Sequence, residues 1–379
     1  MANSYYQTPT TPRLYVSYPL WQYANGGLYV DGDNIDMRTK LINLNPSNPT
    51  TIPIPTEEST SVHFGYNVVN RPVYDIDGNE TGPLPKNLWN FNYCMLLNHN
   101  FHTLNAKVSF AQVVGSSSDE EFSEFQTVLN NESIVNWTNE SACEYDGFSI
   151  FSLNGMGSVD QLGAGIIIES AEDTPLQTYD KDIQLGCVAF GRYFDFPQNC
   201  DLNTSLSYNY GTSSVKTFAG KSINTTKWTK ADSWYNASTG GTEPFGLRVS
   251  HANETGDDDA YSFRKKSGLR VWNISFDSLA PKYLMNQNPM MNNYGWNSQS
   301  FENYSTDVDG ESSYDIDNAV DFYTNCVHRT NGGSLPMVMQ INKDDNSPHN
   351  FVIVKMSSYK ITQKLPNLYN ISLTLEEQV

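Results

Sequence analysis

The chain has 379 residues, of which 38% are hydrophobic and 13% aromatic, and its formal net charge is −19 at pH 7. A surface this acidic repels phosphate backbones and anionic lipid headgroups, which argues against general nucleic-acid binding and against a polybasic membrane contact. Only 17% of the residues are charged, which excludes a disordered acidic tail.

The N-terminal half predicts a β-sandwich behind an extended arm at residues 1–15. Regularly spaced apolar runs bounded by turn-forming residues over 16–195 are typical of a jelly-roll-like sandwich. Residues 43–60 predict a long loop. The best helix candidate is 118–129, where Phe122 and Phe125 have helical spacing. The expected strands are 14–18, 28–30, 92–97, 106–113, 147–151, 165–168 and 187–194.

Residues 196–379 predict a second β-domain, because the texture of the sequence changes after Pro197. A short helix is expected at 317–327, where Val320, Tyr323 and Val327 share a face. A long loop is expected at 285–315. The expected strands are 270–276, 335–341, 350–356 and 368–376. The fold class is therefore mostly β, with two domains that meet near residue 196.

The five cysteines form no CxxC pair and match no zinc spacing. We expect them to be reduced, mostly buried thiols of a chain made in a cytoplasm, with no disulfide among them. The first residues lack the features of a secretion leader, and no apolar run approaches the roughly 20 residues of a membrane helix.

No motif of a known catalytic centre is present, so we expect neither enzymatic activity nor a cofactor. His99 and His102 have a spacing found in metal sites, but a hydrogen-bonded turn explains them more simply. A cysteine nucleophile would need a histidine positioned beside it. The carboxylates form no recognisable pair of the kind that glycosidases use.

Two acidic turns raise the question of calcium. Alternate carboxylates can converge on a hard cation, which makes Asp307 and Asp309 calcium candidates and Asp75 and Asp77 weaker ones. Neither turn has the full EF-hand spacing, and Asp-Gly turns are common on solvated hairpins. We therefore expect no metal site.

Two stretches carry a resemblance to known families. Residues 317–379 contain a short helix, the turn 330–333, the strand 351–355 and the closing strand 369–377. This order resembles the C-terminal block of distal tail and minor tail proteins of long-tailed bacteriophages. The segments 96–100, 146–148 and 191–194 are similar to jelly-roll domains of phage virion proteins, which are related in fold to galactose-binding modules.

The resemblance implies a structural protein of the virion tail, made in the host cytoplasm, with a C-terminal β-barrel or sandwich. Such proteins form rings, most often hexamers, that join the tail tube to the hub, baseplate or fibres. The 285–315 loop then becomes an interface candidate. Its apolar side chains lie in a segment without helical or strand periodicity, so we expect them to be buried against a neighbouring subunit. These interface candidates are Met285, Met290, Met291, Tyr294 and Trp296.

An alternative function is a carbohydrate-binding adhesin that recognises a host surface glycan. Trp228, Trp234 and Tyr235 lie in loop-like sequence, as do Tyr294 and Trp296. Aromatic rings in such positions can stack on sugar faces. Burial of the same rings at a subunit interface is the competing explanation, because interfaces are enriched in aromatic residues.

Overall fold

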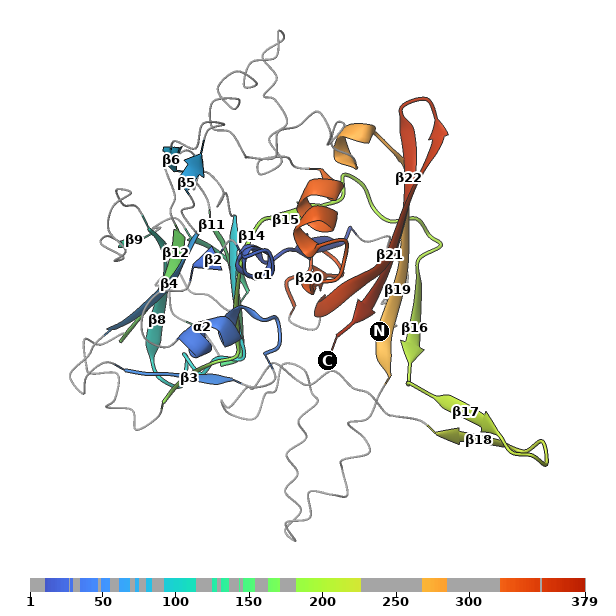
Figure 1. The fold of residues 1–379 in the computed structure, drawn as a ribbon, viewed down its shortest axis with the longest axis horizontal. Coiled ribbons are helices and arrows are strands. Elements are labelled where there is room, and N and C mark those ends of the chain that lie inside the picture. Colours follow the sequence, from blue (N-terminus) through green and yellow to red (C-terminus); the bar gives the residue numbers. More distant parts are fainter. Residues whose placement is uncertain are drawn as a thin grey trace, which may run out of the picture.

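A computed structural model describes the parts of the chain on which the following account rests. They are residues 11–26, 28–29, 35–46, 49–54, 61–68, 72–74, 80–83, 92–113, 125–127, 131–135, 143, 146–153, 163–170, 182–225, 268–284, 321–347 and 350–378. Most of these residues lie in antiparallel sheets, which confirms the prediction of a mostly β fold (Figure 1).

Two antiparallel sheets pack face to face and confirm the expected N-terminal sandwich. The five-stranded sheet has the order β2 (Leu28–Tyr29), β4 (Ser61–Val68), β12 (Gly163–Ser170), β8 (Ala106–Val113) and β9 (Phe125–Thr127). The four-stranded sheet has the order β10 (Asn131–Val135), β11 (Phe148–Leu153), β7 (Tyr93–Leu97) and β14 (Cys187–Gly191).

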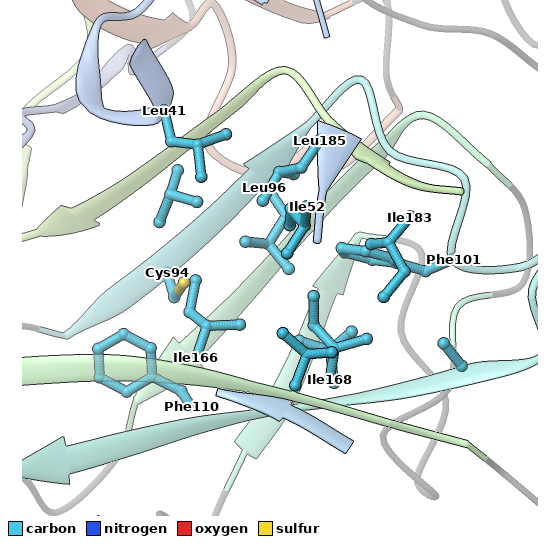
Figure 2. Close-up of a cluster of buried hydrophobic side chains, with 14 of the residues drawn as sticks. Leu41, Ile52, Cys94, Leu96, Phe101, Phe110, Ile166, Ile168, Ile183 and Leu185 are labelled. Carbon is cyan, nitrogen blue, oxygen red and sulfur yellow. The ribbon is translucent and has the colours of Figure 1, made fainter. Parts of the chain in front are cut away.

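The apolar side chains that these two sheets turn toward each other form one buried core (Figure 2). Phe110 and Ile166 come from the five-stranded sheet, and Cys94 and Leu96 from the four-stranded sheet. Helix α2 (Ile35–Ile42) adds Leu41 and Ile42 to the same core. Successive side chains of a strand point to opposite faces of the sheet, so alternate residues of each strand turn into this core.

Six further strands of the described ranges form three two-stranded sheets. β3 (Thr50–Ile52) pairs with β13 (Ile183–Leu185), and β5 (Pro72–Tyr74) pairs with β6 (Glu80–Pro83). β17 (Ser213–Lys216) pairs with β18 (Ser222–Thr225). The expectation of a continuous loop at 43–60 was therefore wrong at β3, whose Ile52 is buried in the sandwich core.

A seven-stranded antiparallel sheet forms the other half of the molecule. Its order is β15 (Tyr193–Asp195), β1 (Arg13–Tyr15), β20 (Met337–Gln340), β21 (Phe351–Leu365), β22 (Leu368–Glu377), β19 (Leu269–Leu279) and β16 (Ser205–Asn209). The sheet curls, so that Phe196 beyond β15 stacks on Phe276 of β19 with ring centroids 3.9 Å apart. It does not close: β15 and β16 are its two ends, and the expected C-terminal barrel is an open curled sheet.

The four-stranded sheet is the middle layer of the molecule and is covered on both faces. Cys94 and Leu96 of β7 face the sandwich core, whereas Tyr93 and Met95 pack against the seven-stranded sheet. This second core also contains Tyr15 and, from the C-terminal strands, Val338, Phe351 and Ile353. The sheets thus form three stacked layers joined by two apolar cores.

The strands of the outer layer come from both sides of the predicted domain boundary. The boundary near residue 196 falls directly after β15, but β15 and β1 belong to the same sheet as β19 to β22. Residues 13–15 of the predicted arm are extended but packed, because Leu14 and Tyr15 are buried. Residues 1–10 of the arm lie outside the described residues.

Short helices fill the space beside the seven-stranded sheet. The predicted helix at 317–327 corresponds in its described part to a π-helical turn, η4 (Tyr323–Val327), followed by the 3-10 turn η5 (His328–Thr330). A further 3-10 turn, η3 (Pro281–Tyr283), follows β19. The helix expected at 118–129 was wrong over Phe125–Thr127, which form β9.

Helix α1 (Tyr18–Ala24) connects the N-terminal segment to the C-terminal half. Ser17 caps it by accepting a hydrogen bond from the Leu20 backbone N–H, and a proline occupies its first turn. The Arg329 guanidinium lies 3.8 Å from the centroid of the Tyr18 ring. A cation held over an aromatic face is an attractive contact that links α1 to η5.

Gly191 ends β14 where the chain passes from the middle layer to β15 in the outer layer, and its surroundings leave no room for a side chain. A Cβ atom on Gly191 would lie 2.3 Å from the carbonyl oxygen of Val16 and 2.6 Å from the Tyr18 ring. Glycine therefore permits the backbone of β14 to pass directly beneath α1 before the chain enters β15.

Candidate functional site

A buried polar cluster lies at the end of the sandwich core. The backbone N–H of Phe101 donates to His99 Nδ1 at 3.4 Å, so the neutral ring carries its proton on Nε2, 2.8 Å from Ser149 Oγ. Cys143 Sγ lies 3.4 Å from the same hydroxyl oxygen. Asp146 accepts hydrogen bonds from the backbone N–H and the hydroxyl of Thr103.

The types of residue in this cluster resemble those of a nucleophilic centre, but their electrostatics do not. Burial lowers the pKa of His99 to about 3, against the opposing effect of Asp146, so the ring is a poor base. Burial also raises the pKa of Cys143 to about 12, which keeps the thiol protonated and unreactive. His99, Ser149 and Cys143 are all buried. The cluster therefore fits a structural role, in which it holds the turn at 98–105.

His102 contacts this cluster through the backbone and does not pair with His99 as a second ligand. Its Nδ1 donates to the backbone carbonyl of Cys143 at 2.9 Å, which is the structural hydrogen bond expected from the sequence. In the parts of the chain that the structure describes, no three His, Cys, Asp or Glu side chains gather as a metal site would require.

The other predicted site residues lie outside the described residues. These are the calcium candidates Asp307, Asp309, Asp75 and Asp77, the interface candidates Met285, Met290, Met291, Tyr294 and Trp296, and the aromatic residues Trp228, Trp234 and Tyr235. The structure brings none of them to a described site, so their roles stay predictions.

All five cysteines are free thiols, which gives the prediction about disulfides a direct test. In native protein, a thiol-specific reagent should modify partly exposed Cys200 quickly and the other four cysteines only after unfolding. Burial raises the pKa of Cys94, Cys143, Cys187 and Cys326, and only the thiolate reacts.

Spectroscopic titration with a chromogenic disulfide reagent measures both the number of thiols that react and the rate at which they react. Cys200→Ser should abolish the fast phase. Titration in denaturant without reductant should find all five thiols. A second fast thiol would contradict the described burial, and fewer than five would reveal a disulfide.

A different region offers the most accessible surface of the described chain. Strand β16 is an edge strand whose five side chains are all exposed, including Leu206 and Tyr208. The β17–β18 hairpin follows it and projects beyond the end of the sheet (Figure 1). Val215, Phe218 and Ile223 on this hairpin are exposed. The sequence predicts strand and loop over residues 201–245 but gives no sign of this exposure.

A second hairpin projects from the same sheet, at the opposite ends of its strands from the β17–β18 hairpin (Figure 1). It consists of the distal parts of β21 and β22, which are joined by Pro366 and Asn367. Tyr359 and Leu365 are exposed on it, and Lys364 forms an exposed ion pair with Asp277 at 3.1 Å. Exposed pairs of this kind contribute little to stability, so this hairpin adds a second exposed surface to the sheet.

No protein-family model matches the chain, and no curated protein matches it either. Among the helices of the described ranges, none has the length and apolar character needed to cross a membrane. Function must therefore be inferred from the surface and the cores.

Proposed function

We propose that the chain is a structural component of a bacteriophage tail that joins the tail tube to the hub, baseplate or fibres. The observation that carries this proposal is the combination of a rigid body with projecting apolar hairpins. Three sheets joined by two buried cores give a body with few ways to deform. Val215 and Ile223 are exposed cross-strand partners, Phe218 is exposed on the turn of the same hairpin, and exposed apolar side chains gathered on one element often mark an interaction site.

The electrostatics of the buried cluster support an assembly role over catalysis. With a pKa lowered to about 3, His99 is a weak base, and the Cys143 thiol, whose pKa is raised to about 12, stays protonated, so the two are poorly suited to act as base and nucleophile near neutral pH. The C-terminal block that resembles tail proteins supplies β20, β21 and β22, which lie next to one another in the outer sheet. Partners in this proposal are further copies of the chain and neighbouring tail proteins.

The purified protein should assemble into a closed homo-oligomeric ring, with a hexamer expected. Native mass spectrometry gives the number of copies, and negative-stain electron microscopy shows whether the particle is a ring. The control is the same sample at a hundredfold lower concentration, where dissociation by mass action should release monomers. A monomer at all concentrations up to about 100 μM would refute self-assembly.

Carbohydrate binding is the second candidate, favoured by Tyr208 and Tyr210. Tyr208 is 52% exposed on β16, and Tyr210, which directly follows the strand, is 39% exposed. Tyr208 and Tyr210 are two residues apart in the sequence, and exposed aromatic rings are suited to stack on the faces of a glycan. A glycan array separates the two functions: this candidate requires a sugar ligand whose binding is lost in Tyr208→Ala, whereas the tail function does not.

A further inference from the structure

The two ends of the seven-stranded sheet are covered differently. At one end, the Tyr193 N–H of β15 donates to Asn92 Oδ1 at 3.1 Å, so the segment that leads into β7 occupies part of this edge. At the other end lies β16 (Figure 1), and none of the described strands pairs with its outer side. Within the described chain, β16 is therefore the open edge of the sheet.

The hydrogen bonds of β19 indicate which backbone groups of β16 point outward. The Arg270 N–H donates to the Glu377 carboxylate on the β22 side at 2.8 Å. The Ser275 carbonyl accepts from the Asp201 N–H on the β16 side, also at 2.8 Å. Backbone groups of successive strand residues point to opposite sides, so the odd-numbered residues of β19 face β16. In register, their partners are the odd-numbered residues of β16. The even-numbered residues of β16 therefore direct their N–H and C=O groups outward.

These even-numbered residues are Leu206 and Tyr208, and their side chains share one face of the sheet. Leu206 lies opposite Trp272 in the register, and Tyr208 lies opposite Arg270. Trp272 belongs to the core of the outer sheet, so this face continues the core beyond β19. There it is uncovered, because Leu206 is 37% exposed and Tyr208 is more exposed still. Outward backbone groups and apolar side chains thus belong to the same two residues.

Features that prevent edge pairing are absent from β16. Edge strands of soluble proteins often carry charges, prolines or bulges. The sequence of β16 is SLSYN, and its register with β19 has no irregularity. Its two ends are fixed by local hydrogen bonds, from the Thr204 N–H to the Asp201 carbonyl at 3.2 Å and from the Gly211 N–H to Asn209 Oδ1 at 2.9 Å. β16 is therefore an ordered template for one more strand.

A second copy of β16 fits this template. When two copies lie antiparallel about a two-fold axis at Ser207, Leu206 of each lies opposite Tyr208 of the other. Both pairs then exchange backbone hydrogen bonds, and their side chains meet as apolar cross-strand pairs. With the axis at Leu206 instead, Tyr208 would lie opposite Thr204, whose N–H is already bonded within its turn. Because β16 is uncharged, no like charges meet across the axis. We propose that the β16 strands of two copies pair in this register and join their outer sheets.

This contact goes beyond the proposed function. A two-fold contact uses the same surface on both copies, so it joins two copies and does not by itself close a ring. It therefore adds a second assembly surface to a ring that other surfaces form, and it can be tested whether or not that ring exists.

The first test is a disulfide across the proposed axis. The axis places the two copies of Ser207 opposite each other as a non-hydrogen-bonded pair, with Cα atoms about 4.5 Å apart, which a disulfide can bridge. In a Cys200→Ser background, which removes the partly exposed thiol, Ser207→Cys should form linked dimers under a mild oxidant. Ser205→Cys in the same background is the matched control, because the two copies of residue 205 are offset by roughly 13 Å along the strands. Non-reducing electrophoresis and intact mass measure both.

The second test weakens the contact without oxidation. Ser207→Lys places two like charges opposite each other across the axis, while the side chain is exposed in a single copy. Sedimentation velocity should show a rise of at least about tenfold in the dissociation constant. Ser213→Lys, an exposed position on β17, is the matched control and should leave it unchanged. Tyr208→Pro should weaken the contact too, because it removes an N–H that the ladder with β19 does not use. Circular dichroism checks that each variant is folded.

The outcomes separate this inference from the proposed function. If Ser207→Cys links no faster than Ser205→Cys, or if Ser207→Lys leaves the dissociation constant unchanged, the β16 contact is wrong, and a ring in the same sample keeps the tail function. If Ser207→Lys halves the number of copies and leaves a ring, both proposals hold. If the unchanged protein forms only dimers that Ser207→Lys dissociates, the β16 contact holds and the ring prediction fails. A monomer at all concentrations up to about 100 μM would overturn both.

Discussion

Acidification from pH 7.5 to pH 4.5 should remove about 2–3 kcal/mol of unfolding free energy through His99 alone. The pKa of this histidine is lowered from 6.5 to about 3 in the folded chain by burial. Between these two values the unfolded chain binds a proton that the native protein does not bind. The contribution of His99 to the free energy of unfolding is therefore fully present above pH 6.5. Between pH 6.5 and about pH 3 it falls by about 1.4 kcal/mol for each pH unit of acidification.

A glutamine in place of His99 tests this effect, because it keeps a polar side chain that does not titrate. Urea unfolding at several pH values gives the free energy for both proteins. His99→Gln should be less stable than the parent at pH 7.5, and its free energy should depend less on pH. The control is His102→Gln, which retains His99 and should retain its pH dependence. Parallel pH profiles for His99→Gln and the parent protein would exclude the effect.

Truncation of Phe351 should destabilise the whole molecule by about 3–5 kcal/mol, the range for a large buried aromatic residue. Phe351 begins β21 and packs in the core between the middle and outer sheets. Its ring centroid lies 5.0 Å from that of Phe148 in the middle layer and 6.2 Å from that of Tyr15 in the outer layer. Alanine would leave a cavity that both layers line.

Chemical denaturation followed by tryptophan fluorescence and by far-ultraviolet circular dichroism measures this loss. Both signals should shift together, because the cavity lies between layers that stabilise each other. Lys360→Ala, an exposed position on the same strand, is the matched control and should change stability by less than about 0.5 kcal/mol. A loss below about 1 kcal/mol for Phe351→Ala would mean that the layers do not share this core.

The strands could be predicted where one face is buried and the other is polar or solvated. Residues 106–113 were expected as a strand and form β8 with the same bounds, and the expected strand at 270–276 lies within β19. Helix α1 was missed although Ser17 and Pro19 are typical of a helix start, because seven residues are too few to show a period.

The arrangement of the layers could not be predicted, because it depends on pairs far apart in sequence. Arg13 of β1 is the cross-strand partner of Gln340 of β20, and no local sequence pattern predicts this pairing. The buried cluster joins His99 to Ser149 in the same way. The hairpin at 213–225 shows its alternation and its glycine turn in the sequence, but its exposure depends on what the rest of the fold leaves uncovered.

The middle layer also sets the order of events during synthesis. Strands β7 and β14 emerge from the ribosome long before β20 and β21, which cover one of their faces. At ~5–20 residues per second, the apolar face of β7 and β14 stays uncovered for on the order of 10–50 s before β20 and β21 are made. Over that interval we expect the nascent chain to present Tyr93, Met95 and Ala189 to its surroundings and to bind holding chaperones through them.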